Sequence, residues 1–178
     1  FILKLWSTYF SKGEIEMTKN IYMMVGAAGA GKSTFIKNFF PDAFGVSRDV
    51  ARFDVMAKYK TDDYFAHEKE AFNTYINRIN SAIECGWETV VLDATHLTPK
   101  SRKKVLCRIN IPKEAKLYAV VVRPTLEQHI KQNAQRTGKA FVPVDAIVKQ
   151  YNFYIEPTHE EGFDDVFFGE VTRDVEEK

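Results

Sequence analysis

Residues 26–33 read Gly-Ala-Ala-Gly-Ala-Gly-Lys-Ser, and no other feature of the chain constrains its fold as strongly. The string has the pattern G-x-x-x-x-G-K-[ST], in which the glycines let the main chain turn tightly and aim its N–H groups at phosphate oxygens. It lies between an apolar run at 21–25, typical of a buried strand, and a predicted helix over 33–40. A strand, a phosphate loop and a helix in this order predict an α/β nucleotide-binding domain.

The rest of the chain alternates between predicted strands and predicted helices. Strands are predicted at 43–47, 88–92, 117–122 and 165–169, and helices at 64–85, 100–109, 125–136 and 144–154, with one more helix starting at Arg48. This alternation is typical of βαβ units with parallel strands. The predicted fold class is α/β: a three-layer P-loop NTPase fold, with a mainly parallel sheet of about five strands, helices on both faces and a small helical lid.

One domain is predicted, over residues 17–178. The full 178 residues have the length of a single domain, and a hydrophobic content of 45% can supply one core. Residues 1–16 are predicted to be a non-native or disordered N-terminal extension, because Met17 stands where a natural start would precede the first strand. The alternative is a genuine N-terminal helix or arm that packs on the domain.

Composition limits the partners of the protein. The net charge of +1 provides no global basic field, so a bound polyanion must be held by a local patch. Cys85 and Cys107 are too few for a disulfide framework and suit a reducing compartment. No apolar run reaches the roughly 18 residues that cross a bilayer. We therefore expect a cytoplasmic protein without a membrane partner.

The loop predicts a site for ATP, or a similar nucleoside triphosphate, together with Mg²⁺. Lys32 would neutralise the β- and γ-phosphates, and the Ser33 hydroxyl would ligate Mg²⁺. Asp93 ends a predicted central strand and would hold a Mg²⁺-bound water; the alternative is a turn-capping aspartate without contact to the metal. The predicted phosphate-binding residues are Gly26, Ala27, Ala28, Gly29, Ala30, Gly31, Lys32, Ser33 and Thr34.

Asp49 and Arg52 follow the second predicted strand and should lie at the same edge of the sheet as the loop. Their i, i+3 spacing on the first turn of a helix places both on one face. A carboxylate there can accept the proton of an alcohol, and a guanidinium can hold an anionic acceptor. The alternative is an ordinary surface ion pair.

Four blocks of sequence, in this order, are similar to one known family. They are residues 26–34, Ser47-Arg48-Asp49 with Arg52, V-L-D-A-T-H-L-T-P at 91–99, and 131–139 running into A-F-V-P-V-D at 140–145. In these blocks the chain resembles the 5′-hydroxyl polynucleotide kinases of the bacteriophage type, over about residues 21–154. The loop is shared by many NTPases, whereas the second and fourth blocks are more specific.

The resemblance implies ATP-dependent phosphoryl transfer to the 5′-hydroxyl end of DNA or RNA, in nucleic-acid repair. It implies that Asp49 is the general base on that hydroxyl, that Arg52 holds the neighbouring phosphate, and that Arg136 is a lid arginine on the β- and γ-phosphates. The catalytic residues would be Lys32, Asp49 and Arg136, and the acceptor-binding residues Arg52, Asp49, Thr95, His96 and Gln132. The chain departs from the family pattern at Ala94, His96, Gln132 and around 137–138.

Two other functions stay open. A P-loop kinase of a small-molecule or nucleotide-type acceptor is favoured by the near-neutral charge, and a nucleotide-gated binding module with little turnover is the third possibility. The basic run Lys100, Arg102, Lys103 and Lys104 either follows a nucleic-acid backbone or forms a solvated helix face. An aromatic ring near Phe53 or Tyr59 could stack on a nucleobase, although most aromatic residues are predicted to be packing.

Overall fold

A five-stranded parallel sheet forms the centre of the fold. The computed structural model describes residues 17–138 and 141–169, so the predicted extension at 1–16 lies outside it. The strands of the described chain are β1 (Asn20–Val25), β2 (Phe44–Ser47), β3 (Thr89–Asp93), β4 (Lys116–Val122) and β5 (Asp165–Gly169), in the spatial order β2-β3-β1-β4-β5. The predicted α/β fold is confirmed.

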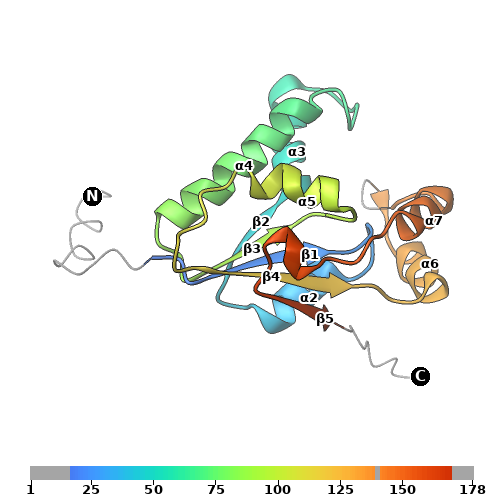
Figure 1. The fold of residues 1–178 in the computed structure, drawn as a ribbon. Coiled ribbons are helices and arrows are strands. Elements are labelled where there is room, and N and C mark those ends of the chain that lie inside the picture. Colours follow the sequence, from blue (N-terminus) through green and yellow to red (C-terminus); the bar gives the residue numbers. More distant parts are fainter. Residues whose placement is uncertain (1–16, 139–140, 170–178) are drawn as a thin grey trace.

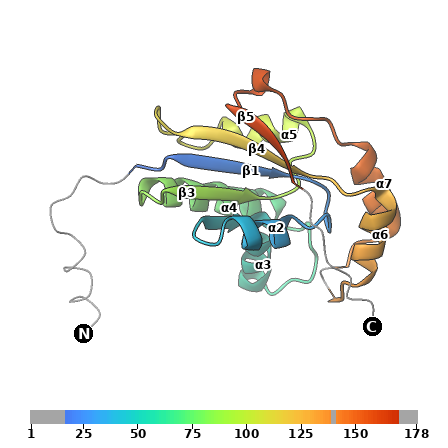
Figure 2. The same cartoon turned by 90° about the horizontal axis from the view of Figure 1, so that it is seen from below.

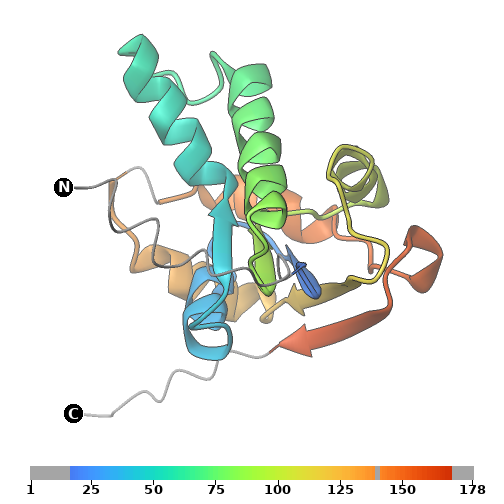
Figure 3. The ribbon, with the colours of Figure 1, turned by 90° about the vertical axis from the view of Figure 1, so that its left-hand side faces the viewer.

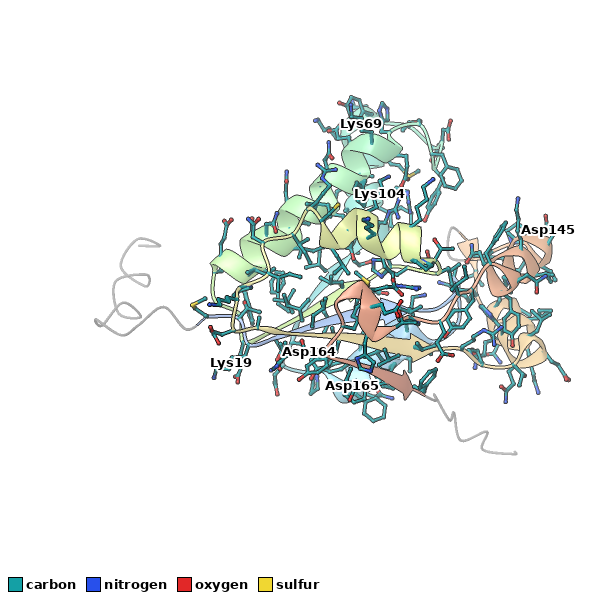
Figure 4. The ribbon with its side chains drawn as sticks, in the orientation of Figure 1. Lys19, Lys69, Lys104, Asp145, Asp164 and Asp165 are labelled. Carbon is teal, nitrogen blue, oxygen red and sulfur yellow. The ribbon has the colours of Figure 1, made fainter. Side chains whose placement is uncertain are left out.

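Helices cover both faces of the sheet and its carboxyl edge. α2 (Lys32–Phe39) lies on one face, and α4 (Glu68–Glu84) and α5 (Pro99–Leu106) lie on the other (Figure 1). α3 (Arg48–Tyr59) packs beside α4, and this hairpin projects from the sheet (Figure 3), with Lys69 near its tip (Figure 4). α6 (Leu126–Ala134) and α7 (Val144–Asn152) lie beyond the carboxyl ends of the strands (Figure 2).

The alternating side chains of the strands build two cores. Ile21, Met23 and Val25 of β1 face the larger core, which includes the buried face of α4. Met24 faces the opposite side, in the core that α2 covers. The central strands β1, β3 and β4 are mostly buried on both faces, so their sequences are nearly continuous apolar runs, which is the signal that predicted them.

Local hydrogen bonds decide where the helices begin. Capping boxes begin two of the helices, since Thr125 pairs with Gln128 at the start of α6, and Thr98 pairs with Ser101 at the start of α5. The helix predicted at 64–85 begins only at Glu68. The side chain of Asp63 accepts a hydrogen bond from the main chain of Phe65 and holds this segment in a turn.

Candidate active site

The segment between β1 and α2 has the geometry of a phosphate-binding loop. A Cβ at Gly26 would lie 2.3 Å from the carbonyl oxygen of Val122 in β4, so only glycine fits where these strands end. Gly29 and Gly31 have φ angles of 88° and 98°, which glycine adopts without strain. Gly31 is the N-cap of α2, so the partial positive charge of that helix lies at the loop.

Lys32 lies inside the loop. Its Nζ donates hydrogen bonds of 2.9 Å to the carbonyl oxygens of Gly26 and Ala27, and the side chain is buried. Burial lowers the pKa of the Lys32 ammonium, while the nearby carboxylates of Asp93 and Asp49 act to raise it. The two aspartates predicted for the site are therefore within electrostatic reach of this ammonium.

Ser33 and Asp93 are brought together at the carboxyl edge of the sheet. The Ser33 hydroxyl donates a hydrogen bond of 3.2 Å to Oδ2 of Asp93, which pairs in register with Ser47 of β2. Burial raises the pKa of the Asp93 carboxyl, opposed by the charge of Lys32. A hydroxyl and a carboxylate are ligands that suit Mg²⁺. Among the described residues no group of three or more His, Cys, Asp or Glu could hold a metal ion.

One side chain from α6 and one from α7 form hydrogen bonds to the main chain of the phosphate loop. His129 of α6 donates from Nε2 to the carbonyl oxygen of Ala28, at 2.7 Å. The Ala28 N–H donates to Oε1 of Gln150 in α7, at 2.8 Å. Both partners are more than 100 residues from the loop in sequence, and no spacing signal could have revealed them. The result is a phosphate loop fixed directly to the helices that follow β4.

Arg136 reaches the phosphate loop from the end of α6. A Cβ at Gly29 would lie 3.3 Å from Nη1 of Arg136, and the charge of this arginine contributes to lowering the pKa of Lys32. The side chain of Asn133 bonds both the N–H and the carbonyl of Val142, at 3.1 and 2.7 Å, and so closes the segment that carries Arg136. Tertiary contacts thus place a second cation beside Gly29 and Lys32 of the loop.

Asp49 is held by a network at the start of α3. Its Oδ1 accepts hydrogen bonds from Nη1 of Arg52, at 2.8 Å, and from the hydroxyl of Tyr64, at 2.7 Å. Glu68 of α4 accepts from Nε and Nη2 of Arg52, at 3.1 and 2.8 Å, and also pairs with Arg48. Oδ2 of Asp49 accepts no hydrogen bond from any residue that the structure describes, and 63% of the side chain is exposed. One carboxylate oxygen is thus fixed by two hydrogen bonds, within a side chain that is largely exposed.

Tyr64 and Glu68 were missed by the sequence analysis. Burial and the Asp49 hydrogen bond raise the pKa of Tyr64 to about 12, so its hydroxyl stays protonated and donates to the carboxylate. Tyr64 lies in a turn and Glu68 at the start of α4, and neither belongs to a recognisable pattern. Only the packing of α4 against α3 brings them to Asp49.

The other residues that were predicted to bind the acceptor are His96, Thr95 and Gln132. His96 was expected at the acceptor edge but is buried among core residues: Nδ1 lies 2.8 Å from the carbonyl oxygen of Met24 and Nε2 lies 3.4 Å from the hydroxyl of Tyr75. That expectation is corrected. Thr95 is half-buried, and its carbonyl accepts a hydrogen bond of 2.9 Å from the N–H of Gly26. Gln132 is half-buried on α6.

His96 should make stability depend on pH. Burial lowers its pKa from 6.5 to about 4. Between these values the unfolded chain binds a proton that the folded chain does not, so the free energy of unfolding should fall as pH drops, by up to about 3 kcal/mol. His96→Asn should remove this part of the dependence. The main-chain φ of 44° is one that asparagine tolerates.

Urea unfolding at several pH values from 7.5 to 4 measures the effect. His159→Asn, at an exposed histidine, should keep the wild-type dependence. The same dependence in wild-type and His96→Asn proteins would contradict the assignment of His96.

The basic run on α5 does not form a continuous cationic face. Arg102 is fully buried and bonds both carboxylate oxygens of Glu161 at 2.7 Å, together with the carbonyl oxygens of His96 and Ile155 at 3.0 Å. Lys104, labelled in Figure 4, lies with its ammonium 4.4 Å from the centre of the Phe72 ring. Arg102 is thus a structural residue that ties α5 to the segment before β5.

A comparison with protein families identifies the domain. The family described as "AAA domain", AAA_33, matches residues 21–157, which include the loop, Asp49, Asp93 and Arg136. The chain belongs to the AAA_33 family. This AAA_33 chain is a P-loop domain of the kinase type, which implies a nucleotide and usually Mg²⁺. No curated protein matches its sequence significantly.

Solved structures confirm the fold. A chain of the Pnkp1/Rnl/Hen1 RNA repair complex matches with a TM-score of 0.62 at 22% identity, covering 80% of this chain and 46% of that one. A sugar kinase of Janibacter sp. HTCC2649 matches at 0.57 and 15% identity, covering 86% and 85%. Kti12 of Chaetomium thermophilum, in complex with ADP-AlF3, matches at 0.56 and 15% identity, covering 84% and 88%. This AAA_33 chain thus spans less than half of the repair-complex chain. No helix in its described part is long and apolar enough to cross a membrane.

Proposed function

We propose that this chain transfers the γ-phosphoryl group of ATP to the 5′-hydroxyl end of DNA or RNA. The observation that carries the proposal is the Asp49 carboxylate, which lies beside the phosphate loop with Oδ1 fixed and Oδ2 open. Folds like this one occur in both an RNA repair complex and a sugar kinase, so the fold does not select the acceptor. The residues around Asp49 support the choice of a nucleic-acid acceptor.

Each side chain of the site has a role in the proposed reaction. Lys32 and Arg136 neutralise the charge of the phosphates, and Thr34, in the first turn of α2, is a further phosphate-binding residue. Asp49 Oδ2 accepts the proton as the acceptor oxygen bonds to the γ-phosphorus, and the bond from that phosphorus to ADP breaks. Ser33 would ligate Mg²⁺ and Asp93 would hold a Mg²⁺-bound water, and the ion would shield the charge of the phosphates.

Arg52 is proposed to hold the acceptor phosphate and to orient Asp49. Four of its five N–H groups bond Glu68, Asp49 and Tyr64. No residue in the described part of the chain accepts a hydrogen bond from the fifth, on Nη2, which we propose for an acceptor oxyanion. The guanidinium is buried, and a charge-assisted hydrogen bond is stronger there than in water.

The proposal is tested with radiolabelled ATP and a panel of acceptors. A 5′-hydroxyl oligonucleotide and a nucleoside 3′-phosphate should be phosphorylated, whereas the bare nucleoside should react poorly because it lacks the oxyanion for Arg52. Sugars should not react. Equal use of nucleosides with and without the 3′-phosphate, or preference for a sugar, would replace this proposal by the second candidate, a small-molecule kinase, which the net charge of +1 favours.

Arg52→Ala is expected to raise the KM for the oligonucleotide by roughly tenfold or more, because one charge-assisted hydrogen bond to the acceptor is lost. The KM for ATP should barely change. Arg78→Ala is the matched control, since Arg78 pairs with Asp54 on the same helix hairpin. A fall in kcat without a change in either KM would mean that Arg52 acts only by orienting Asp49.

A further inference from the structure

A hollow of about 520 Å³ opens along α3, on the side that continues from Asp49. Its lining residues are Phe53, Met56, Ala57, Lys60, Thr61 and Asp62. Phe53 follows Asp49 by four residues, so the two side chains lie on one face of the helix, a turn apart. The lining of the hollow therefore starts one helical turn beyond Asp49 and continues past the end of α3.

Aromatic rings connect Asp49 with this hollow. The ring of Tyr64, whose hydroxyl bonds Asp49, packs edge-on against Phe53 at 6.1 Å between centroids and against Phe65 at 4.9 Å. Phe53 and Phe65 are 37% and 69% exposed. Tyr59 is different, because its ring is stacked on His67 at 3.9 Å. Phe53 is thus the aromatic residue that both lines the hollow and offers an accessible ring.

The position of the hollow fits an extended acceptor. At 1.5 Å of rise per residue, Phe53 lies about 6 Å and Lys60 about 16 Å beyond Asp49 along the helix axis. A single sugar with its hydroxyl at Asp49 would end near the mouth of the hollow, whereas a DNA or RNA strand would continue into it. Phenylalanine, methionine and alanine provide a lining suited to flat nucleobases, and the far end carries both the ammonium of Lys60 and the carboxylate of Asp62.

We propose that this hollow is a subsite for the first nucleobases of the acceptor strand, with Phe53 as the stacking platform. The inference rests on the proposed function and names how the same site holds its substrate. Stacking on an aromatic ring is tolerant of sequence, because every nucleobase has a flat face. The subsite therefore favours DNA or RNA strands over single nucleosides and recognises no particular nucleotide sequence.

The test compares a 5′-hydroxyl oligonucleotide with the same strand made abasic at its first two nucleotides. In the wild-type protein the abasic strand should have a KM roughly tenfold higher. Phe53→Ala should raise the KM of the intact strand by about the same factor and leave that of the abasic strand unchanged, with kcat unaltered. Phe53→Trp should restore the low KM. Phe39→Ala, at an exposed phenylalanine on α2, is the matched control and should behave as wild type.

Two failures can be told apart. If the wild-type protein phosphorylates both strands with equal KM, or if Phe53→Ala raises both KM values equally, the subsite is wrong while the proposed function stands. If the wild-type protein phosphorylates no oligonucleotide, the proposed function fails and the subsite with it. Phe53 is partly exposed, so its replacement should leave the melting temperature nearly unchanged.

Discussion

Lys32→Ala is expected to abolish phosphoryl transfer, with kcat lowered by about 10³-fold. The ammonium is buried in the loop and held by the carbonyl oxygens of Gly26 and Ala27, where charge on the transferred phosphoryl group would develop. In such a water-poor site a fixed positive charge stabilises the transition state more than it would in water. Single-turnover phosphorylation of the preferred acceptor measures the effect.

Lys37→Ala is the matched control for this change. Lys37 lies in the last turn of the same helix, α2, and is exposed, so its loss should leave kcat within about twofold of the wild-type value. Melting curves of both variants separate catalysis from folding. Wild-type turnover by a folded Lys32→Ala protein would show that the loop takes no part in phosphoryl transfer.

Asp49→Asn is expected to lower kcat by about 10²- to 10⁴-fold and to leave ATP affinity nearly intact. The amide has almost the same shape and can still accept the hydrogen bonds of Arg52 and Tyr64 at one oxygen. Its other end no longer accepts a proton from the acceptor hydroxyl. Rapid-quench measurement of the chemical step, together with nucleotide titration, distinguishes the two effects.

Asp54→Asn provides the control for the Asp49 variant. Asp54 lies on the same helix, is exposed and pairs with Arg78, yet it is outside the site, so turnover should remain at the wild-type level. Collapse of ATP binding in Asp49→Asn would place Asp49 in the metal site, near Asp93. Unchanged turnover would remove its role as general base.

The features that depend on neighbours in sequence could be predicted from sequence. The glycines between 26 and 31, the apolar runs of the strands and the cap at Thr98 each act within a few residues, so composition and spacing reveal them. The pairing of Asp49 with Arg52 also follows from helical spacing, and the structure shows it at 2.8 Å.

Predictions failed for two polar residues whose side chains are buried in the structure. His96 was predicted to bind the acceptor, and Arg102 was predicted either to follow a nucleic-acid backbone or to lie on a solvated helix face. Both are buried, because the main-chain carbonyls of Met24 and Ile155 and the carboxylate of Glu161 supply partners that make burial of a polar side chain tolerable. These partners come from distant parts of the chain.

The sequence by itself determined the phosphate loop, the parallel sheet and the carboxyl edge where the site lies, since these arise from short-range patterns and from the common direction of the strands. Only the tertiary structure decided how the site is held. His129 and Gln150 hydrogen-bond to Ala28 of the phosphate loop. Tyr64 and Glu68 hydrogen-bond to Asp49 and Arg52, respectively. These contacts join residues far apart in the sequence or in an irregular turn, so they form only when the helices pack.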